Sequence, residues 1–361
     1  MYQFLKPFLF RLAPETAHDI TLGGLSLCAK STILTKVLYK IYGQKISSLP
    51  VSIMGLNFEH PIGLAAGLDK DARAFNAFSA LGFSAVEMGT VTPLPQPGNP
   101  KPRMFRLTED RAIINRMGFN SGGLTSFLNN IKAVPRRSNT IAGINIGKNK
   151  LTSNKHANSD YINALNAVYM QADYITVNIS SPNTESLREL QGQEPLNKLL
   201  TEIGEARQEL IEKHKLRKPI ALKIAPDLTS SEIKIIAELL IDKQFDALIA
   251  TNTTVTRMSS LRSGHQNEQG GLSGAVLKKM SNEVIAEFYS HLKGQVPIIG
   301  VGGIETAEDA WEKLLAGADF LQIYSGLIYH GPEMIQQIVT GLQDKTQHYS
   351  SLAEALSAER M

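Results

Sequence analysis

Eight short apolar segments, spread along the chain from residue 61 onward, constrain its fold more than any other feature. They alternate with longer stretches in which apolar residues recur at helical spacing, and this alternation is typical of repeated βα units around a parallel sheet. The eight predicted strands are Pro61–Gly67, Ala85–Val91, Ile141–Gly147, Tyr174–Ser181, Pro219–Pro226, Ala247–Thr253, Pro297–Gly303 and Phe320–Gly326. Eight strands with intervening helices fit a single (β/α)8 TIM barrel of the α/β class.

The segments between these strands predict the helices of the barrel. They are Ala72–Leu81, Asp160–Met170, Glu194–His214, Ser231–Asp242, Asn282–Leu292, Thr306–Ala316 and a last helix after Gly331-Pro332. A doubly wound sheet is the less suitable alternative. Such a sheet usually carries a glycine fingerprint after its first strand, and Gly63-Leu64-Ala65-Ala66-Gly67, the glycine-containing run at the first strand here, lacks the glycine spacing of a dinucleotide-binding fingerprint.

Composition and charge exclude several classes of protein. With 43% hydrophobic and 20% charged residues, the chain is typical of a folded globular protein. Its formal net charge of +3 is too small to predict a nucleic-acid partner. Cys28 is the one cysteine, so no internal disulfide and no CxxC metal site can form, and no metal is predicted. No apolar run reaches the roughly 18 residues that a membrane-spanning helix needs.

Residues 1–45 differ from the rest of the chain. Their apolar residues recur at helical spacing in three segments, and their basic residues outnumber the acidic Glu15 and Asp19. Short amphipathic helices with a basic face can lie on an anionic membrane surface. They can also simply cap the main domain, and the pattern leaves both interpretations open.

Two connections are too long to be plain linkers. Residues 92–120 follow the second strand and include Arg103–Asn115, in which apolar residues flank a turn and predict a small hairpin. Residues 254–280 follow the sixth strand and are polar and rich in Gly and Ser. Both can fold over the barrel mouth. Residues 183–193 are a candidate mobile lid, and the tail at 345–361 is predicted to be helical, with no chemistry that its residues reveal.

Polar residues follow the predicted strands where each strand ends. The fourth strand leads into Asn178-Ile179-Ser180-Ser181-Pro182-Asn183-Thr184, where Pro182 cannot continue a central strand. This carboxyl edge is where chemistry takes place in parallel α/β folds. The same run is also ordinary for a surface turn, so its meaning depends on what the other strands deliver.

Two further features of these strand ends predict a cofactor. Lys223 lies within an otherwise apolar fifth strand, where burial is costly unless the lysine meets a polar or anionic partner. Gly300-Val301-Gly302-Gly303 and Tyr324-Ser325-Gly326 end the seventh and eighth strands, at the phosphate site of this fold, and Gly271 and Gly274 can close the same cradle. Flavin mononucleotide (FMN) fits both demands.

Asparagines predict the kind of substrate. Asn115, Asn145, Asn178, Asn183 and Asn252 all fall on segments at the mouth. An asparagine side chain offers two donors and one acceptor carbonyl, which matches a planar amide or imide.

The chain resembles the class 2, membrane-associated, quinone-dependent dihydroorotate dehydrogenases from about Phe8 to about Gly341. The motifs that carry the resemblance are Gly63–Lys70 with Asp71, Gly89–Pro93, Asn115–Asn120, Asn145–Asn149, Asn178–Thr184, Lys223–Asp227, Gly300–Ile304 and Gln322–Gly326. The resemblance implies oxidation of dihydroorotate to orotate in pyrimidine biosynthesis, with electrons passing through FMN to a membrane quinone.

The resemblance also implies residue roles. Ser181 resembles the base that takes the C5 proton, and Thr184 and Phe119 resemble residues that shape its proton relay. Class 1 members place a cysteine there, whereas Cys28 is far from any strand end. The implied cofactor-binding residues are Ala66, Gly67, Leu68, Asp69, Lys70, Thr90, Asn145, Asn178, Lys223, Thr251, Gly274, Gly303, Tyr324 and Ser325. The implied substrate-binding residues are Lys70, Asn115, Arg116, Met117, Gly118, Phe119, Asn178, Asn183, Asn252 and Thr253.

The N-terminal helices acquire a role through the same resemblance. They are expected to contact the membrane surface and admit the quinone, near His18, Arg106 and Tyr324. This implies a peripheral protein on the cytoplasmic side of the cell inner membrane. The expected division of the chain is a membrane and quinone-access segment at 1–45, an FMN-binding catalytic barrel at 46–344 and a tail at 345–361. Alternatives are an FMN barrel acting on another amide-like ring, and a non-enzymatic scaffold attached to a membrane or partner.

Overall fold

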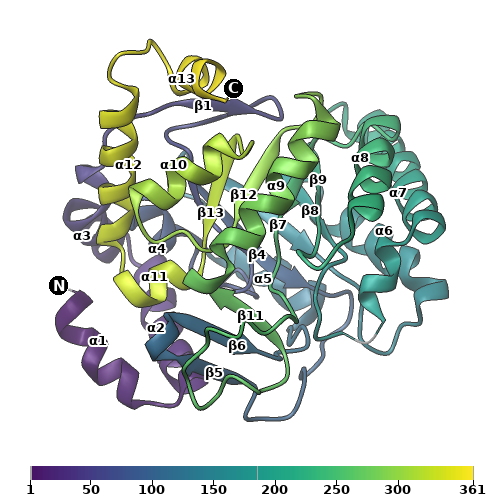
Figure 1. Cartoon of the computed structure of the whole chain (residues 1–361). Helices are drawn as coiled ribbons and strands as arrows, with labels where there is room; N and C mark the ends of the chain where they lie inside the picture. Colours follow the sequence, from purple (N-terminus) through teal and green to yellow (C-terminus); the bar gives the residue numbers. More distant parts are fainter. Residues whose placement is uncertain (1, 185, 361) are drawn as a thin grey trace.

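Eight parallel strands form a closed barrel at the centre of the molecule (Figure 1). The structure, a computed structural model, describes residues 2–184 and 186–360. The barrel strands are β3 (Ile62–Leu64), β4 (Ala85–Val91), β7 (Ile141–Ile146), β8 (Tyr174–Asn178), β9 (Ile220–Lys223), β10 (Ala247–Ala250), β12 (Ile298–Val301) and β13 (Phe320–Ile323). All eight predicted strands and the predicted fold class are confirmed.

Each barrel strand pairs with the strands before and after it in the barrel, and β13 closes on β3 with Ile323 opposite Leu64. Because all the pairs are parallel, the carboxyl ends meet at one rim. Nearly every residue of these strands is buried, since helices cover the outside and side chains fill the inside. This explains why they read as continuous apolar runs. At the other end of the barrel the hairpin of β1 (Val51–Ile53) and β2 (Leu56–Phe58) packs Phe58 on Phe320, with ring centroids 4.4 Å apart.

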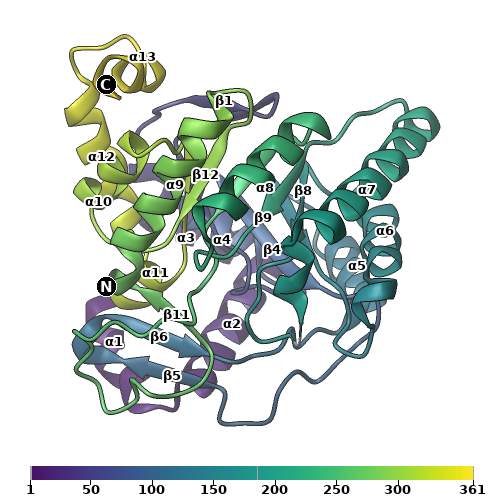
Figure 2. The same ribbon diagram turned by 45° about the vertical axis from the view of Figure 1, so that its right-hand side comes forward.

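Helices follow the strands and surround the barrel (Figures 1 and 2). They are α4 (Phe75–Ala80), α5 (Gly123–Ala133), α6 (Ala157–Val168), α7 (Gln193–His214), α8 (Ser230–Asp242), α9 (Lys278–Leu292), α10 (Ala307–Leu315), α11 (Ser325–His330) and α12 (Glu333–Thr346). The 3-10 helices are η1 (Gly43–Lys45), η2 (Thr108–Asp110), η3 (Asn154–His156), η4 (Leu187–Gln191) and η5 (Ala275–Leu277). Capping boxes start α8 at Thr229 and α10 at Thr306. The helices predicted between the strands are confirmed, with ends shifted by a few residues.

A small sheet lies over the rim of the barrel, below it in the view of Figure 1. The predicted hairpin consists of β5 (Met104–Leu107) and β6 (Ala112–Asn115). A third strand, β11 (Gly271–Gly274), pairs with β6 and comes from the long connection at 254–280, for which no strand was predicted. The predicted lid at 183–193 includes residue 185, which lies outside the described residues.

Three helices precede the barrel, as predicted for residues 1–45: α1 (Tyr2–Arg11), α2 (Pro14–Lys30) and α3 (Thr32–Ile41). Both ribbon views place α1 and α2 beside β5 and β6. Glu15 of α2 binds Arg103 at the start of this hairpin, with 2.8 Å between Oε1 and Nη2. Among the described residues no helix is both long and apolar enough to cross a membrane.

The tail is helical, as expected. α12 continues to Thr346, and α13 (Leu352–Glu359) buries Leu352 and Leu356 against the core. Arg360 fixes this end of the chain to the barrel, since its Nη1 lies 3.1 Å from Oδ1 of Asp319.

Candidate active site

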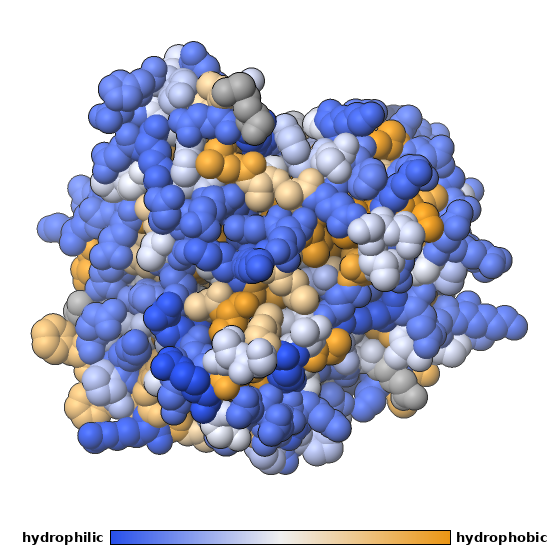
Figure 3. All heavy atoms as spheres, in the orientation of Figure 1, coloured by the Kyte–Doolittle hydropathy of each residue, from blue (hydrophilic) through white to orange (hydrophobic). Residues whose placement is uncertain are grey.

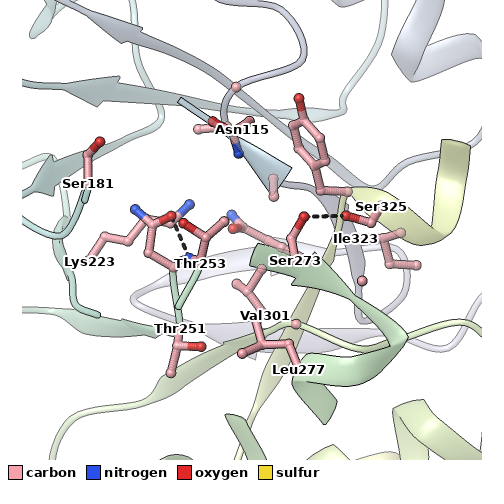
Figure 4. A pocket seen from close by; sticks show the side chains of 18 of the residues that line it. Asn115, Ser181, Lys223, Thr251, Thr253, Ser273, Leu277, Val301, Ile323 and Ser325 are labelled. Carbon is pink, nitrogen blue, oxygen red and sulfur yellow. Dashed lines mark hydrogen bonds between the residues drawn. The ribbon is translucent and has the colours of Figure 1, made fainter. Parts of the chain in front are cut away.

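A cavity of about 140 Å³ lies at the carboxyl rim of the barrel, between the strand ends and the small sheet (Figure 4). Residues from seven of the eight strand ends and from β6 and β11 line it. Of the residues predicted from the sequence, the cavity is lined by Ala66, Gly67, Lys70, Thr90, Asn115, Met117, Gly118, Phe119, Asn178, Ser181, Asn183, Lys223, Thr251, Asn252, Thr253, Gly274, Gly303, Tyr324 and Ser325. The residues come together because parallel strands deliver their carboxyl ends to one place.

Other predicted residues lie outside this lining. Asp69 is fully buried and its carboxylate accepts hydrogen bonds from the backbone N–H groups of Arg73 and Ala74, at 2.8 and 2.7 Å. Leu68 faces a different, apolar cavity. Arg116 turns to the edge of the mouth, where its guanidinium lies 2.8 Å from Glu268.

Ser181 lies just past the end of β8 and is almost fully buried. Its Oγ accepts a hydrogen bond of 3.3 Å from the backbone N–H of Asn183. The Oγ1 of Thr184 is buried and has no hydrogen-bond partner among the described residues. Phe119, with a positive φ of 51°, lines the cavity from the loop after β6. Figure 4 shows Ser181 and Ser325 at opposite sides of the cavity.

The asparagines of the cavity are held by one another and by hydroxyl groups. Asn178 donates from Nδ2 to Oγ1 of Thr90 at 3.0 Å and to Oδ1 of Asn145 at 3.2 Å. Asn145 therefore lies behind the lining and supports it. Asn183 donates to Oδ1 of Asn115 at 3.3 Å, which joins the loop after β8 to β6. The amides are thus oriented before any ligand binds.

Lys223 has a buried acidic neighbour that the sequence reading missed. Its Nζ lies 4.0 Å from Oε1 of Glu87, a fully buried residue of β4. Glu87 also accepts hydrogen bonds from Asn145 at 2.8 Å, Tyr174 at 2.9 Å and Gln322 at 2.7 Å. Burial lowers the pKa of Lys223, and the Glu87 carboxylate opposes that shift. Glu87 could have been predicted by the same signal as Lys223, because each is a charged residue within an otherwise apolar strand.

Lys70 is a second cation at the cavity, and its side chain is half-buried. Its Nζ donates to Oδ1 of Asn120. Burial, assisted by the nearby charge of Arg103, lowers the pKa of Lys70 to about 8. The side chain can therefore carry a positive charge toward an anionic ligand at neutral pH.

The glycines at the rim leave no room for side chains. Gly303 has a φ of +72°, and a Cβ there would lie 2.4 Å from Cα of Lys278; a Cβ on Gly274 would lie 2.3 Å from the carbonyl oxygen of Arg111. The hydroxyls of Ser273 and Ser325 lie 2.9 Å apart beside these loops (Figure 4). Backbone N–H groups and hydroxyls close to a ligand in this way suit a phosphate.

Polar atoms inside the cavity also suit a polar ligand. Oγ1 of Thr251, Oγ1 of Thr253 and Oε1 of Gln322 are buried without a hydrogen-bond partner among the described residues. All three side chains belong to the lining. Buried polar atoms are normally paired, so a ligand with its own donors and acceptors fits this cavity.

A second cavity, of about 290 Å³, lies between the N-terminal helices and the barrel and is lined mainly by apolar side chains. It brings together His18, Arg106 and Tyr324, and Tyr324 lines the first cavity as well. Burial, and to a smaller extent the charge of Lys70, lowers the pKa of His18. Arg106 donates to the carbonyl oxygen of Phe10 at 3.0 Å, and its guanidinium lies 4.3 Å from the centre of that ring.

Comparisons with known proteins agree with this arrangement. Residues 48–346 match the family model for dihydroorotate dehydrogenase. A dihydroorotate dehydrogenase (quinone) of Shewanella baltica (strain OS185) is 50% identical over 344 residues, which cover 95% of this chain and 99% of that protein. The protein of the same description from Shewanella oneidensis is 49% identical over 338 residues, or 94% and 98% of the two chains.

Solved structures show the same likeness. The crystal structure of the Eimeria tenella DHODH in complex with ferulenol has a TM-score of 0.86 and 39% sequence identity to this chain. The match covers 96% of this chain and 94% of that one. The likeness therefore extends beyond the barrel into the N-terminal helices.

Proposed function

The chain belongs to the dihydroorotate dehydrogenase family, and we propose that its two cavities divide the reaction between them. The protein is a flavin-dependent oxidoreductase of pyrimidine biosynthesis that oxidises dihydroorotate to orotate with a quinone as the electron acceptor. The relatives support this substrate over the other amide-like ring that the residues alone left open.

FMN is the flavin that fits the first cavity. The tight loops around Gly303 and Gly274, with Ser325, suit its single phosphate. Lys223 and the unpaired hydroxyl of Thr251 suit the polar edge of its ring. The chemistry that bound flavin supplies is acceptance of the hydride that leaves C6 of dihydroorotate, and release of electrons to a quinone.

Dihydroorotate is held by amides and by Lys70. Asn115, Asn178, Asn183 and Asn252 present donors and acceptors to one cavity, and the ring of the substrate offers matching carbonyl and N–H groups. Lys70 pairs with the substrate carboxylate. These contacts fix the ring over Ser181, and such fixed positioning supplies much of the rate of an enzymatic step.

Ser181 is the base. Its Oγ removes the proton from C5 while the hydride leaves C6, which forms the double bond of orotate. An isolated serine hydroxyl is a weak base, so it must pass its own proton onward. The buried and unpaired Oγ1 of Thr184, close in sequence, is suited to receive it through a water. Phe119 shields this route from bulk solvent.

The second cavity receives the quinone, with His18, Arg106 and Tyr324 at its polar points. Its mainly apolar lining suits a lipid-soluble ligand. The N-terminal helices also expose large apolar side chains, among them Phe4 at 81%, Phe8 at 66% and Ile33 at 76% of their surface. Figure 3 shows such hydrophobic atoms over α1, at the lower left. These helices bind the surface of the inner membrane from the cytoplasmic side.

One observation carries the proposal: Ser181, four asparagines, Lys70 and Lys223 line a single cavity at the barrel rim. The test is anaerobic bleaching of the flavin absorbance by dihydroorotate. Ser181→Ala should keep the flavin bound and slow bleaching by about 100-fold or more. Bleaching at the normal rate in this variant would remove Ser181 from the role of base.

Membrane binding has its own test. A variant with Phe4→Ser, Phe8→Ser and Ile33→Ser should bind anionic lipid vesicles on the order of 1000-fold more weakly, because each of the three apolar side chains contributes about 1.5 kcal/mol when it is buried in the membrane surface. Leu151→Ser is the matched control, since Leu151 is 98% exposed on a loop after β7. Equal vesicle binding by the triple variant and the control would contradict the membrane role.

A further inference from the structure

Arg188 joins the ends of three neighbouring barrel strands. It lies in η4, just after the loop that carries Ser181. Its Nε donates to the carbonyl oxygen of Ser180 at 3.0 Å, its Nη1 lies 2.7 Å from Oδ2 of Asp227, and its Nη2 donates to the carbonyl oxygen of Thr253 at 2.7 Å. These three acceptors belong to the loops that follow β8, β9 and β10.

Ser180 extends this connection into the substrate cavity. Its hydroxyl donates to Oδ1 of Asn178 at 2.9 Å and accepts from Nδ2 of Asn252 at 2.9 Å. A single residue held by Arg188 thus orients two asparagines proposed to bind the substrate. It is also the neighbour of Ser181, so its carbonyl position sets where the Ser181 side chain begins.

Asp227 completes the arrangement on the other side of the guanidinium. Its carboxylate accepts from the hydroxyl of Thr254, from the hydroxyl of Thr256 at 3.1 Å and from the N–H of Val255 at 3.3 Å. These residues follow Thr253, so the Arg188–Asp227 pair grips the loop after β10 at several points. The guanidinium is planar and rigid, and a lysine ammonium cannot reproduce such a fork of bonds.

We propose that Arg188, paired with Asp227, is a positioning residue that holds the Ser181 loop and the Asn252–Thr253 loop at the separation that the ring substrate requires. Arg188 is not part of the cavity lining, so it acts through the residues it holds and touches no reacting atom. The inference rests on the proposed roles of Ser181 and Asn252. In this proposal, Arg188 places the side chains of Ser181 and Asn252 where both can contact the same substrate ring.

The variants are Arg188→Met, which removes the fork, and Arg188→Lys, which keeps the charge. Arg207→Met is the matched control. Arg207 also pairs with an aspartate, 2.8 Å from Oδ2 of Asp246, but at the far end of the barrel, beside the amino end of β10. Loss of Arg207 should therefore lower stability and leave the cavity intact.

Three measurements separate positioning from plain stability: the rate of flavin bleaching by dihydroorotate, the rise in Tm on adding orotate, and rescue by guanidinium ion at concentrations too low to unfold the protein. Arg188→Met should bleach about 100-fold more slowly, since misplacement by about 1 Å can cost that much. It should also lose most of the rise in Tm on adding orotate, and added guanidinium should restore part of the bleaching rate. Arg188→Lys should bleach at a rate between those of the wild type and Arg188→Met. Arg207→Met should lower the Tm measured without orotate and leave the bleaching rate and the rise in Tm with orotate unchanged.

The proposal is overturned if Arg188→Met and Arg207→Met bleach at the same rate. It is also overturned if the slow bleaching of Arg188→Met comes with a normal response to orotate and no rescue by guanidinium. Ser181→Ala separates this outcome from failure of the proposed function. Normal bleaching in Ser181→Ala would rule out Ser181 as the base. The orotate and guanidinium measurements on the Arg188 variants would still test whether Arg188 positions the two loops.

Discussion

Replacement of Gly303 by alanine tests the phosphate cradle, because the structure predicts both a strained backbone and a collision. A non-glycine residue at a φ of +72° costs about 1 kcal/mol. The new Cβ would also lie 2.4 Å from Cα and 2.5 Å from N of Lys278, at the start of α9. Backbone atoms of a helix cannot yield as a flexible side chain can, so the loop after β12 must move.

The size of the effect on FMN follows from the bonds that this movement breaks. A hydrogen bond to a charged group contributes about 1.5 to 3 kcal/mol. Losing one such bond to the phosphate should raise the Kd for FMN by about 10- to 100-fold. The assay is titration of flavin fluorescence with protein freed of its flavin, alongside urea unfolding of the same sample.

Gly294→Ala is the matched control, since Gly294 has a φ of +75° and nothing within 4 Å of the added Cβ. Its free energy of unfolding should fall by about 1 kcal/mol, with an unchanged Kd for FMN. Wild-type affinity for FMN in Gly303→Ala would refute the assignment of this loop to the phosphate. Weaker affinity in both variants would show that strain alone is responsible.

Three further predictions concern buried charges. The pKa of His60 is lowered to about 4 by burial, and its Nδ1 accepts from the N–H of Ile62 at 3.3 Å. The folded state therefore loses about 3 kcal/mol of stability as the pH falls from about 6.5 to 4, and urea unfolding of His60→Gln should lack this loss. Since the pKa of Lys70 is about 8, kcat/KM for dihydroorotate should fall as the pH rises through that value, and Lys70→Met should be slow with no such limb in its pH profile. Glu87→Gln should lower the free energy of unfolding by about 3 kcal/mol, because it leaves Lys223 unpaired. The double variant Glu87→Gln, Lys223→Met should lose less stability than the sum of the losses in the two single variants. Strictly additive losses in urea unfolding would argue against an interaction between Glu87 and Lys223.

The barrel could be predicted because its strands are buried on both faces, so each is written as an apolar run. All five residues of β8 are buried, for example. β11 could not be predicted in this way, because half of its residues are glycine and it has no apolar pattern. It is a strand because β6 lies beside it, with Gly271 opposite Asn115.

The candidate site was predicted well where a side chain follows directly from a strand end, and less well where the backbone turns. Ser181 and Lys223 line the cavity, as their places just after β8 and at the end of β9 suggest. Asp69 follows β3 but turns to the backbone N–H groups of Arg73 and Ala74. The role of Arg188 could not be predicted, because nothing local in the sequence shows that its three acceptors come from three different loops.

Tyr324 lines both cavities, so its side chain lies between the cavity proposed for the pyrimidine and the cavity proposed for the quinone. Burial raises the pKa of Tyr324 to about 12, and its ring is therefore neutral at physiological pH. With the two sites as proposed, dihydroorotate and the quinone bind in separate cavities. Each can therefore bind and leave without displacing the other. An inhibitor that fills the apolar cavity should leave orotate affinity unchanged while it stops turnover.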